Sequence, residues 1–221
     1  MDLSIQPFYE QESVRIYHGD SYQLLSEIPD GSAGLVLTDP MYNIGFDYGN
    51  GLDDNQDHAV YEDQMDTFLD ESLRISTAVI FTPGLANLAM WYGRHDIQPC
   101  WLVAWYKGNS SSSCPVGSSQ WEPVLAYGEV ENRRFPDIFH APIDYDEEGY
   151  FHPTPKPELW AEELLKRFYT SGTTVLDPFM GSGTTAVVCL KYKIPYVGID
   201  IVEKFCAGTV ERLKKFETDE N

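Results

Sequence analysis

Apolar and polar residues follow two different periods along this chain. Short β-branched and apolar runs that end in turn residues predict strands, and longer segments with an apolar residue every three or four positions predict helices. The predicted strands are Val14–Tyr17, Gly34–Thr38, Ala78–Thr82, Trp101–Tyr106, Val124–Tyr127, Thr174–Leu176 and Tyr196–Ile199. The predicted helices are Tyr22–Ile28, Tyr61–Ser76, Leu85–Tyr92, Pro157–Tyr169, Thr184–Tyr192 and Glu203–Phe216. This alternation indicates an α/β protein with a mostly parallel sheet covered on both faces.

Three segments lack either period. Asn43–Ala59 is polar, rich in glycine and aspartate, and too long for a simple connection, so we interpret it as a lid or binding loop. The serine-rich Gly108–Ser119 is interpreted as a mobile loop, and Glu129–Phe151 shows no periodicity. At the first predicted helix, Ser21 is expected to cap the N-terminus.

Length and composition favour one domain that occupies residues 1–221. A chain of 221 residues that is 43% hydrophobic can build one core of good size but not two. No apolar run approaches the length of a membrane span, and the acidic N-terminus lacks a signal-peptide pattern. We therefore expect a soluble, cytoplasmic protein without membrane partners.

The four cysteines do not predict a metal site or a catalytic nucleophile. Cys100, Cys114, Cys189 and Cys206 are scattered, with no CxxC pair and no nearby histidine cluster, so we expect reduced thiols and no bound metal. Pro99-Cys100 resembles the nucleophile dipeptide of cytosine carbon-5 methyltransferases. A buried cysteine at the start of an apolar strand is the interpretation we prefer.

The net charge of −20 is unusual for a protein that binds nucleic acid, because such proteins normally present basic surfaces to phosphates. Asp53–Glu71 alone contains eight carboxylates and neither lysine nor arginine. One interpretation is function at high salt, where repulsion between acidic groups is screened, in a protein encoded by a virus or a salt-adapted host. The other is weak DNA binding by the chain alone, or mimicry of DNA. Local compensation around the cleft is a third.

Aspartates follow four of the predicted strands, at Asp20, Asp39, Asp177 and Asp200. An aspartate in this position is most often a turn former or a helix cap. The carboxyl ends of parallel strands meet at one edge of a sheet, however, and ligands of such sheets bind there. Four carboxylates at one edge suit a ligand with hydroxyl groups, an amine and a positive charge.

A glycine-rich turn in Thr173–Thr185 joins a strand to a helix, with the sequence TTVLDPFMGSGTT. Glycine allows a ligand to approach the backbone, and the exposed N–H groups of a helix N-terminus attract electron-rich atoms. No Lys-Ser/Thr pair follows, which excludes a Walker-type phosphate loop, and the dinucleotide pattern of three glycines is incomplete.

DPFMGSGTT resembles the S-adenosylmethionine loop of the amino-group DNA methyltransferases. LTDPMY at Leu37–Tyr42 is similar to their DPPY motif, and HPTPKP at His152–Pro157 to their HPTQKP motif. WEPVLAYG at Trp121–Gly128 and the segment Tyr196–Leu213 also resemble the family, so the likeness covers nearly the whole chain. The DPPY-like motif precedes the glycine loop, as in the permuted β group, whereas release-factor glutamine methyltransferases have the reverse order.

The resemblance implies a Rossmann-like S-adenosylmethionine-dependent methyltransferase fold with a circularly permuted motif order. Its sheet is expected to have seven strands in all, mostly parallel, with one antiparallel strand among them that the Trp101–Tyr127 hairpin would supply. The cofactor-binding residues implied by the family are Asp20, Thr154, Lys156, Asp177, Phe179, Gly181, Gly183, Thr184 and Asp200. Among them, Asp200 would bind the ribose, Asp20 the adenine and Lys156 the methionine carboxylate.

The same resemblance implies methylation of the N-6 amino group of adenine in DNA. Asp39 and the carbonyl of Pro40 would accept the amino N–H bonds, and Tyr42 would stack on a base that has left the duplex. Two positions depart from the family motifs: Met41 replaces the second proline of DPPY, and Pro155 replaces glutamine in HPTQKP.

Several alternatives stay open. Asp at the first motif position resembles the adenine enzymes more than the cytosine N-4 enzymes, which often have serine, but cytosine N-4 and an RNA amino group remain candidates. A catalytically silent module that binds the cofactor is an alternative of another class. Residues 129–151 would form a minimal target-recognition insert, with Arg133 and Arg134 as DNA contacts or a solvated surface pair. Family members often dimerise, but the sequence does not decide whether this chain does. It also does not decide whether the chain has a role in restriction–modification.

Overall fold

A computed structural model describes residues 3–11, 13–48, 54–93, 97–110, 113–114, 117–131, 133–143 and 151–219. Parts of the three irregular segments lie outside the described residues. These parts are 49–53 of the predicted lid, 111–112 and 115–116 of the serine-rich segment, and 132 and 144–150 of the predicted insert.

Strands and helices alternate as the sequence periods predict. The strands of the main sheet are β1 (Tyr9–Gln11), β2 (Val14–His18), β3 (Ala33–Thr38), β4 (Ser76–Phe81), β5 (Trp101–Tyr106), β8 (Trp121–Gly128), β9 (Ile138–His140), β10 (Val175–Asp177) and β11 (Tyr196–Asp200). The short pair β6 (Ser113–Cys114) and β7 (Gly117–Ser118) stands apart from it. The helices are α1 (Ser21–Leu25), α2 (His58–Ile75), the 3-10 turn η1 (Leu85–Asn87), α3 (Leu88–Gly93), α4 (Glu158–Phe168), α5 (Thr184–Lys191) and α6 (Glu203–Asp219).

The main sheet has nine strands within the described ranges, in the order β1-β2-β11-β10-β3-β4-β8-β5-β9. The expected count of seven strands is therefore wrong, because two short edge strands are added. β1 pairs antiparallel with β2, and β9 pairs parallel with β5. Both have three residues, too few to show a period of their own, and they form because the neighbouring edge offers unpaired backbone groups. The expected antiparallel strand is β8, and β1 is a second one.

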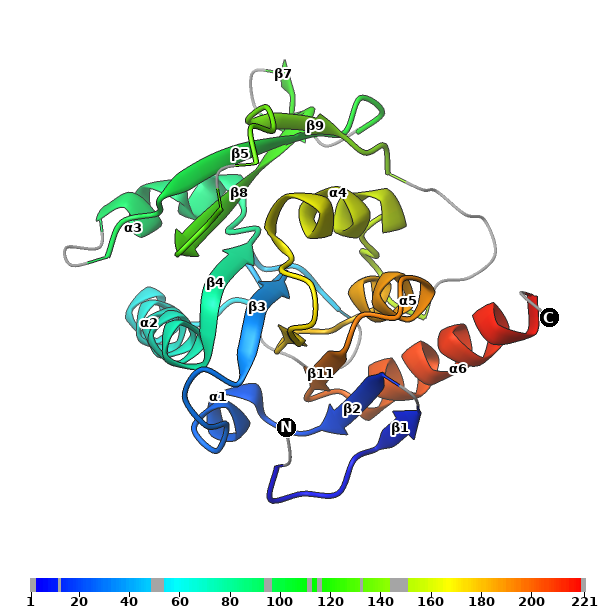
Figure 1. Cartoon of the computed structure of the whole chain (residues 1–221). Helices are drawn as coiled ribbons and strands as arrows, with labels where there is room; N and C mark the ends of the chain where they lie inside the picture. Colours follow the sequence, from blue (N-terminus) through cyan, green and yellow to red (C-terminus); the bar gives the residue numbers. More distant parts are fainter. Residues whose placement is uncertain are drawn as a thin grey trace.

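Helices cover both faces of the sheet (Figure 1). Alternate residues of one strand enter different cores, as Leu35 and Leu37 of β3 pack with α4, α5 and α6, and Val36 packs with α1, α2 and α3. Large aromatic side chains pack in both cores, among them fully buried Trp160 on one face and Trp91 on the other. The architecture is the α/β arrangement with a mostly parallel sheet that the sequence predicts. None of the helices in the described ranges is long and apolar enough to cross a membrane.

Three local expectations need correction. The side chain that caps α1 is that of Asp20, which accepts the N–H of Tyr22 at 2.9 Å, while the Ser21 hydroxyl donates to the carbonyl of Pro178. Cys100 is exposed rather than buried, because it lies just before β5 and not within it. Strand β8 begins three residues before the predicted start at Val124. It can include Pro123 because this residue pairs with β5 but lies beyond the residues that pair with β4, so one side of its backbone needs no strand partner.

Candidate functional site

The four aspartates that follow strands do converge. Asp20, Asp39, Asp177 and Asp200 all line one cavity of about 260 Å³ at the carboxyl edge of the parallel strands. The cavity lies at the ends of the neighbouring strands β10 and β3, whose following crossovers run in opposite directions, to β11 and to β4. This is the switch point at which doubly wound sheets bind ligands.

The glycine turn after β10 forms the floor of this cavity. Gly181 and Gly183 both have positive φ, 54° and 71°, and Gly183 is the residue that precedes the first turn of α5. A Cβ atom on Gly183 would overlap the side chain of Thr209 in α6. Glycine is therefore required at position 183 both for its conformation and for packing between the loop and α6.

Asp177 and Asp200 are buried acids that also hold the loop in place. Asp200 accepts the N–H of Gly181 and of Val202, each at 2.8 Å, and Asp177 accepts the Thr38 hydroxyl at 2.7 Å. Burial raises the pKa of Asp177 to about 7 and that of Asp200 to about 6, although these hydrogen bonds oppose the shift. The edge of the sheet thus concentrates acids that a cationic ligand would stabilise.

The raised pKa of Asp177 makes stability depend on pH. The folded protein keeps a proton on Asp177 that the unfolded chain releases near pH 4, so the free energy of unfolding should fall as pH rises from about 4 to about 7. The effect is of the order of 2–4 kcal/mol. An Asp177→Asn variant should lose it, which urea unfolding from pH 5 to pH 8 would measure. The exposed Asp63, changed to asparagine, is the control. Equal pH dependence in both variants would contradict this assignment.

Aromatic rings frame two ends of the cavity. Tyr22, just after Asp20, has its ring centroid 5.8 Å from that of Phe179. At the other end, the ring of His152 lies 4.5 Å from that of Phe205 and 6.0 Å from that of Tyr48. Burial, together with nearby Lys156, lowers the pKa of His152 to about 4, so the imidazole is neutral near pH 7. A cationic ligand would meet no second positive charge at this histidine.

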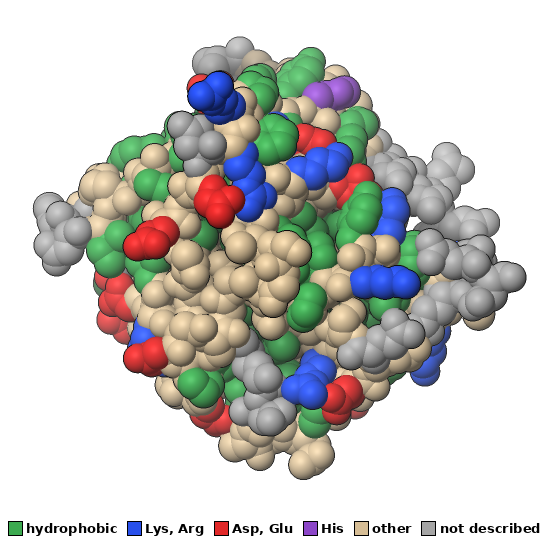
Figure 2. Space-filling model, in the orientation of Figure 1, with side chains coloured by type: hydrophobic (Ala, Val, Ile, Leu, Met, Phe, Trp, Pro, Cys, Tyr) green, Lys and Arg blue, Asp and Glu red, His purple; other side chains and the backbone are tan. Residues whose placement is uncertain are grey.

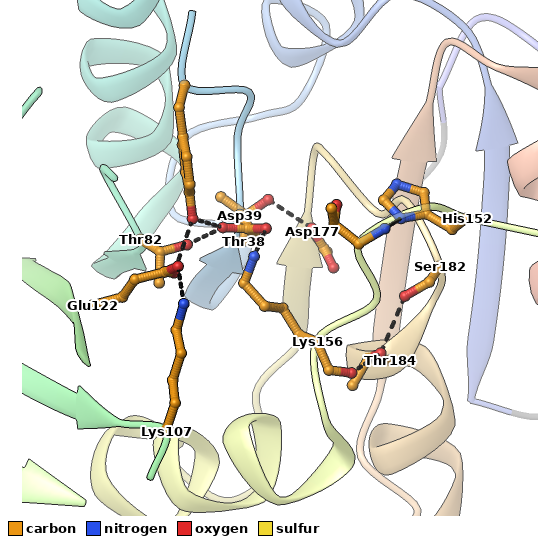
Figure 3. A network of polar contacts seen from close by, with 12 residues as sticks. Thr38, Asp39, Thr82, Lys107, Glu122, His152, Lys156, Asp177, Ser182 and Thr184 are labelled. Carbon is orange, nitrogen blue, oxygen red and sulfur yellow. Dashed lines mark hydrogen bonds and ion pairs between the residues drawn. The ribbon is translucent and has the colours of Figure 1, made fainter. Parts of the chain in front are cut away.

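Asp39 lies at the rim of the cavity and accepts three donors (Figure 3). Its Oδ1 accepts the hydroxyl of Tyr42 at 2.6 Å and the hydroxyl of Thr82, and its Oδ2 accepts the ammonium of Lys156. Burial lowers the pKa of Lys156, but the carboxylates of Asp39 and Glu122 outweigh this effect and raise it above the usual value. The motif residues 39, 42 and 156 thus form one charged cluster, although they come from distant parts of the chain.

Sequence reasoning did not identify a second ion pair beside this cluster. Lys107, which is only 5% exposed, follows β5 and bonds to Glu122 near the start of β8. Glu122 in turn lies 3.3 Å from the Tyr42 hydroxyl. The WEPVLAYG motif contains Glu122, but the isolated Lys107 carries no recognisable signal, because only strand pairing brings the two together.

The described part of the predicted lid is organised by Asp54, which is 4% exposed. Its carboxylate accepts the backbone N–H groups of Asn43, Ile44 and Phe46 at 2.8–3.2 Å. These bonds draw the segment after Tyr42 against the cavity, which Tyr48 also lines. The position of Asp54 in a run of acids masks its role in the sequence.

The predicted cofactor residues Thr154 and Thr184 also line the cavity. The Thr184 hydroxyl donates to the carbonyl of Lys156 at 2.8 Å and so ties the HPTPKP segment to α5. Lys156 bonds to Asp39 in this structure. The predicted contact between Lys156 and a ligand carboxylate therefore stays a prediction.

Arg133 and Arg134 lie apart from these residues. They line a second hollow together with Gly128. Gly128 is the last residue of β8, whereas Glu122 lies near the start of the same strand. Arg133 pairs with Glu131 at 2.9 Å. On the face seen in Figure 2, the basic side chains of the described residues are scattered among acidic ones and form no continuous stripe. DNA contact by this arginine pair stays a prediction.

Comparisons with known proteins give a consistent result. A family model described as DNA methylase, N6_N4_Mtase, matches residues 93–211, more than half of the chain. The type II methyltransferase M.HpaI of Haemophilus parainfluenzae is 26% identical over 233 residues, which cover 90% of this chain and 74% of that one. PvuII DNA methyltransferase, cytosine-N4-specific, has a similar fold, with a TM-score of 0.74, 16% identity and coverage of 98% and 95%. The M1.HpyAVI–SAM complex also has a similar fold, with a TM-score of 0.66 and 16% identity. The match covers 90% of this chain and 98% of that one.

Proposed function

Since this chain belongs to the N6/N4 DNA methylase family, we propose that it methylates the N-6 amino group of adenine in DNA, with S-adenosylmethionine as the methyl donor. The observation that carries this proposal is the position of Asp39. Its carboxylate stands at the rim of the same cavity that the glycine loop, Asp20 and Asp200 line. An amino group bound to Asp39 would therefore lie beside a cofactor bound in the cavity.

The cavity residues fit this cofactor. Asp200 Oδ2 accepts one donor among the described contacts, the N–H of Gly181, and so retains a lone pair for a ribose hydroxyl. Tyr22 and Phe179 present rings on the side of Asp20, as an adenine would require. When bound, S-adenosylmethionine supplies a methyl group whose bond to sulfur breaks, with the electron pair going to sulfur, as the bond to nitrogen forms.

Asp39 and Pro40 would make the amino nitrogen more nucleophilic. The lone pair of an aromatic amine is delocalised into the ring, and acceptors for its N–H bonds localise that pair and stabilise the developing positive charge. Asp39 Oδ2 accepts only Lys156 among the described residues, which leaves a lone pair for the amine. Met41 does not remove the Pro40 carbonyl, so this departure from the family motif spares the group that the mechanism needs.

Tyr42 is proposed to contact the target base after it leaves the duplex. Its hydroxyl is bound by Asp39, and its ring lies directly against Gly84, where a Cβ would come within 2.8 Å of the ring. Gly84 has φ of 71°. The turn after β4 thus limits the ring of Tyr42 to one position next to the acceptor.

The proposed function predicts methyl transfer to unmethylated genomic DNA. Radioactive methyl from S-adenosylmethionine should appear as N-6-methyladenine, and an Asp39→Ala protein should give none. The assay should run from low salt to several molar, because a net charge of −20 opposes DNA binding when screening is weak. Label in N-4-methylcytosine would overturn the choice of base. An absence of label at every salt concentration, with cofactor still bound, would overturn the proposed DNA activity.

A further inference from the structure

We propose that Tyr42 acts as a hydrogen-bond switch whose hydroxyl proton turns from Asp39 to Glu122, with the ring in place, when Asp39 takes up the proton released by the methylated amino group. This inference rests on the proposed function and assigns a role to Glu122, which lies outside the predicted site. Glu122 does not line the cavity and would act through Tyr42, so we call it a positioning residue.

The contacts around Tyr42 are one proton short. Three donors reach Asp39, one donor reaches Glu122, and Tyr42 lies between the two carboxylates. The Tyr42 hydroxyl has a single proton, and its shorter contact, 2.6 Å, is with Asp39. The phenolic oxygen lies 3.3 Å from the Glu122 carboxylate. While the Tyr42 proton is directed at Asp39, no proton lies between these two oxygens. A proton that binds Asp39 removes this mismatch.

The chemical step that would deliver this proton is balanced. After methylation the amino nitrogen carries a positive charge and an N–H bond directed at Asp39 Oδ2. That bond breaks with its electron pair remaining on nitrogen, and an O–H bond forms on Asp39. Asp39 loses its negative charge and becomes a poorer acceptor, so the Tyr42 hydroxyl turns to the ionised Glu122. Tyr42 keeps its proton throughout.

Surrounding charges support each part of the switch. Burial, followed by the carboxylates of Asp39 and Glu122, raises the pKa of Tyr42, which keeps the phenol protonated. Lys107 is buried against Glu122 and lies 5.0 Å from the ring of Trp105, so the side chain of Glu122 is held in one place. Among the described residues, the other titratable groups that face Asp39 or Lys156 are Tyr48, Tyr61 and His152, and Asp54 in turn faces Tyr48 and Tyr61.

The chain contains a matched control for the Tyr42–Glu122–Lys107 group. On α4, Glu162 accepts the Tyr192 hydroxyl at 3.0 Å and the Lys191 ammonium at 2.8 Å. Glu162→Gln and Tyr192→Phe therefore make the same chemical changes in a similar set of contacts that has no part in the site. Both should leave the single-turnover rate of methyl transfer unchanged.

Glu122→Gln tests the switch. It should slow single-turnover methyl transfer by about tenfold at pH 7, less than the roughly 10²–10⁴-fold that a general base itself contributes, and the loss should shrink as pH or the concentration of an added buffer base rises. A base from solution can then take the proton that Asp39 holds less well. A loss that is equal at every pH and buffer concentration would indicate a structural role and overturn the switch, as would a rate equal to that of Glu162→Gln.

A titration separates the switch from the proposed function. Carboxyl ¹³C NMR of the protein without DNA should show the Glu122 signal moving at the pH where Asp39 takes up a proton, because the two sites are coupled through Tyr42. Tyr42→Phe should abolish this movement, and Tyr192→Phe should not. Absence of coupling in the wild-type protein would overturn the switch. Absence of methyl transfer by a wild-type protein that shows the coupling would instead overturn the proposed function.

Discussion

Asp39→Asn should lower the rate of methyl transfer by about 10³-fold while cofactor binding persists. An amide cannot take up the charge that develops on the amino nitrogen, and removal of one preorganised electrostatic partner typically costs about 10²–10³ in rate. The substitution also leaves the Lys156 ammonium, whose side chain is 14% exposed, without its carboxylate partner. Single-turnover transfer would measure the rate, and calorimetric titration with S-adenosylmethionine the binding.

The surface pair of Asp30 and Arg74 provides the control for this variant. Asp30 accepts Arg74 at 2.6 Å with its side chain 81% exposed, so Asp30→Asn breaks a carboxylate–cation pair outside the site. It should change neither rate nor binding. An Asp39→Asn protein that retained a rate within a few fold of wild type would place the acceptor of the amino group elsewhere.

Gly183→Ala is expected to destabilise the protein by about 2–4 kcal/mol and to weaken cofactor binding at least tenfold. Its φ of 71° costs an alanine about 1 kcal/mol, and the new Cβ overlaps Thr209, which is fully buried. The loop must then move away from α6 and into the cavity. Urea unfolding gives the change in stability, and calorimetry gives the change in affinity.

Gly172→Ala separates the two causes. Gly172 has φ of 82° with nothing within 4 Å of an added Cβ, so alanine there should cost only the backbone strain of about 1 kcal/mol. Thr209→Ala combined with Gly183→Ala removes Oγ1 and Cγ2, two of the three atoms nearest to the new Cβ, and should recover part of the loss. Equal effects of Gly172→Ala and Gly183→Ala would show that contact with α6 does not matter.

The charges of the acidic surface and those inside the site differ in their balance and in how strongly salt screens them. Within the site, Lys156 pairs with Asp39 and Lys107 with Glu122, so these four side chains carry no excess charge despite a net charge of −20 for the chain. Surface charges act at longer range and are screened by salt, whereas the buried pairs are screened much less. We therefore expect salt to change DNA binding more than the rate of the bound complex, which a salt series under single-turnover conditions would measure.

Local patterns in the sequence determined much of this protein. The run before Asp177, the glycines at 181 and 183 and the following helix act over a few residues, so strand, turn and helix are visible in the order of residue types. The same holds for the four aspartates, because parallel strands place their carboxyl ends at one edge. Their predicted convergence is confirmed by the shared cavity.

Only the tertiary structure decided which charges meet. Lys156 bonds to Asp39 across 117 positions of the chain, and Lys107 meets Glu122 because β5 and β8 pair in one particular register. The edge strands β1 and β9 likewise exist through their neighbours, since three residues carry no period of their own. Short-range preferences determine which residues form strands, turns and helices. Contacts between distant side chains depend on packing and register, which no local pattern contains.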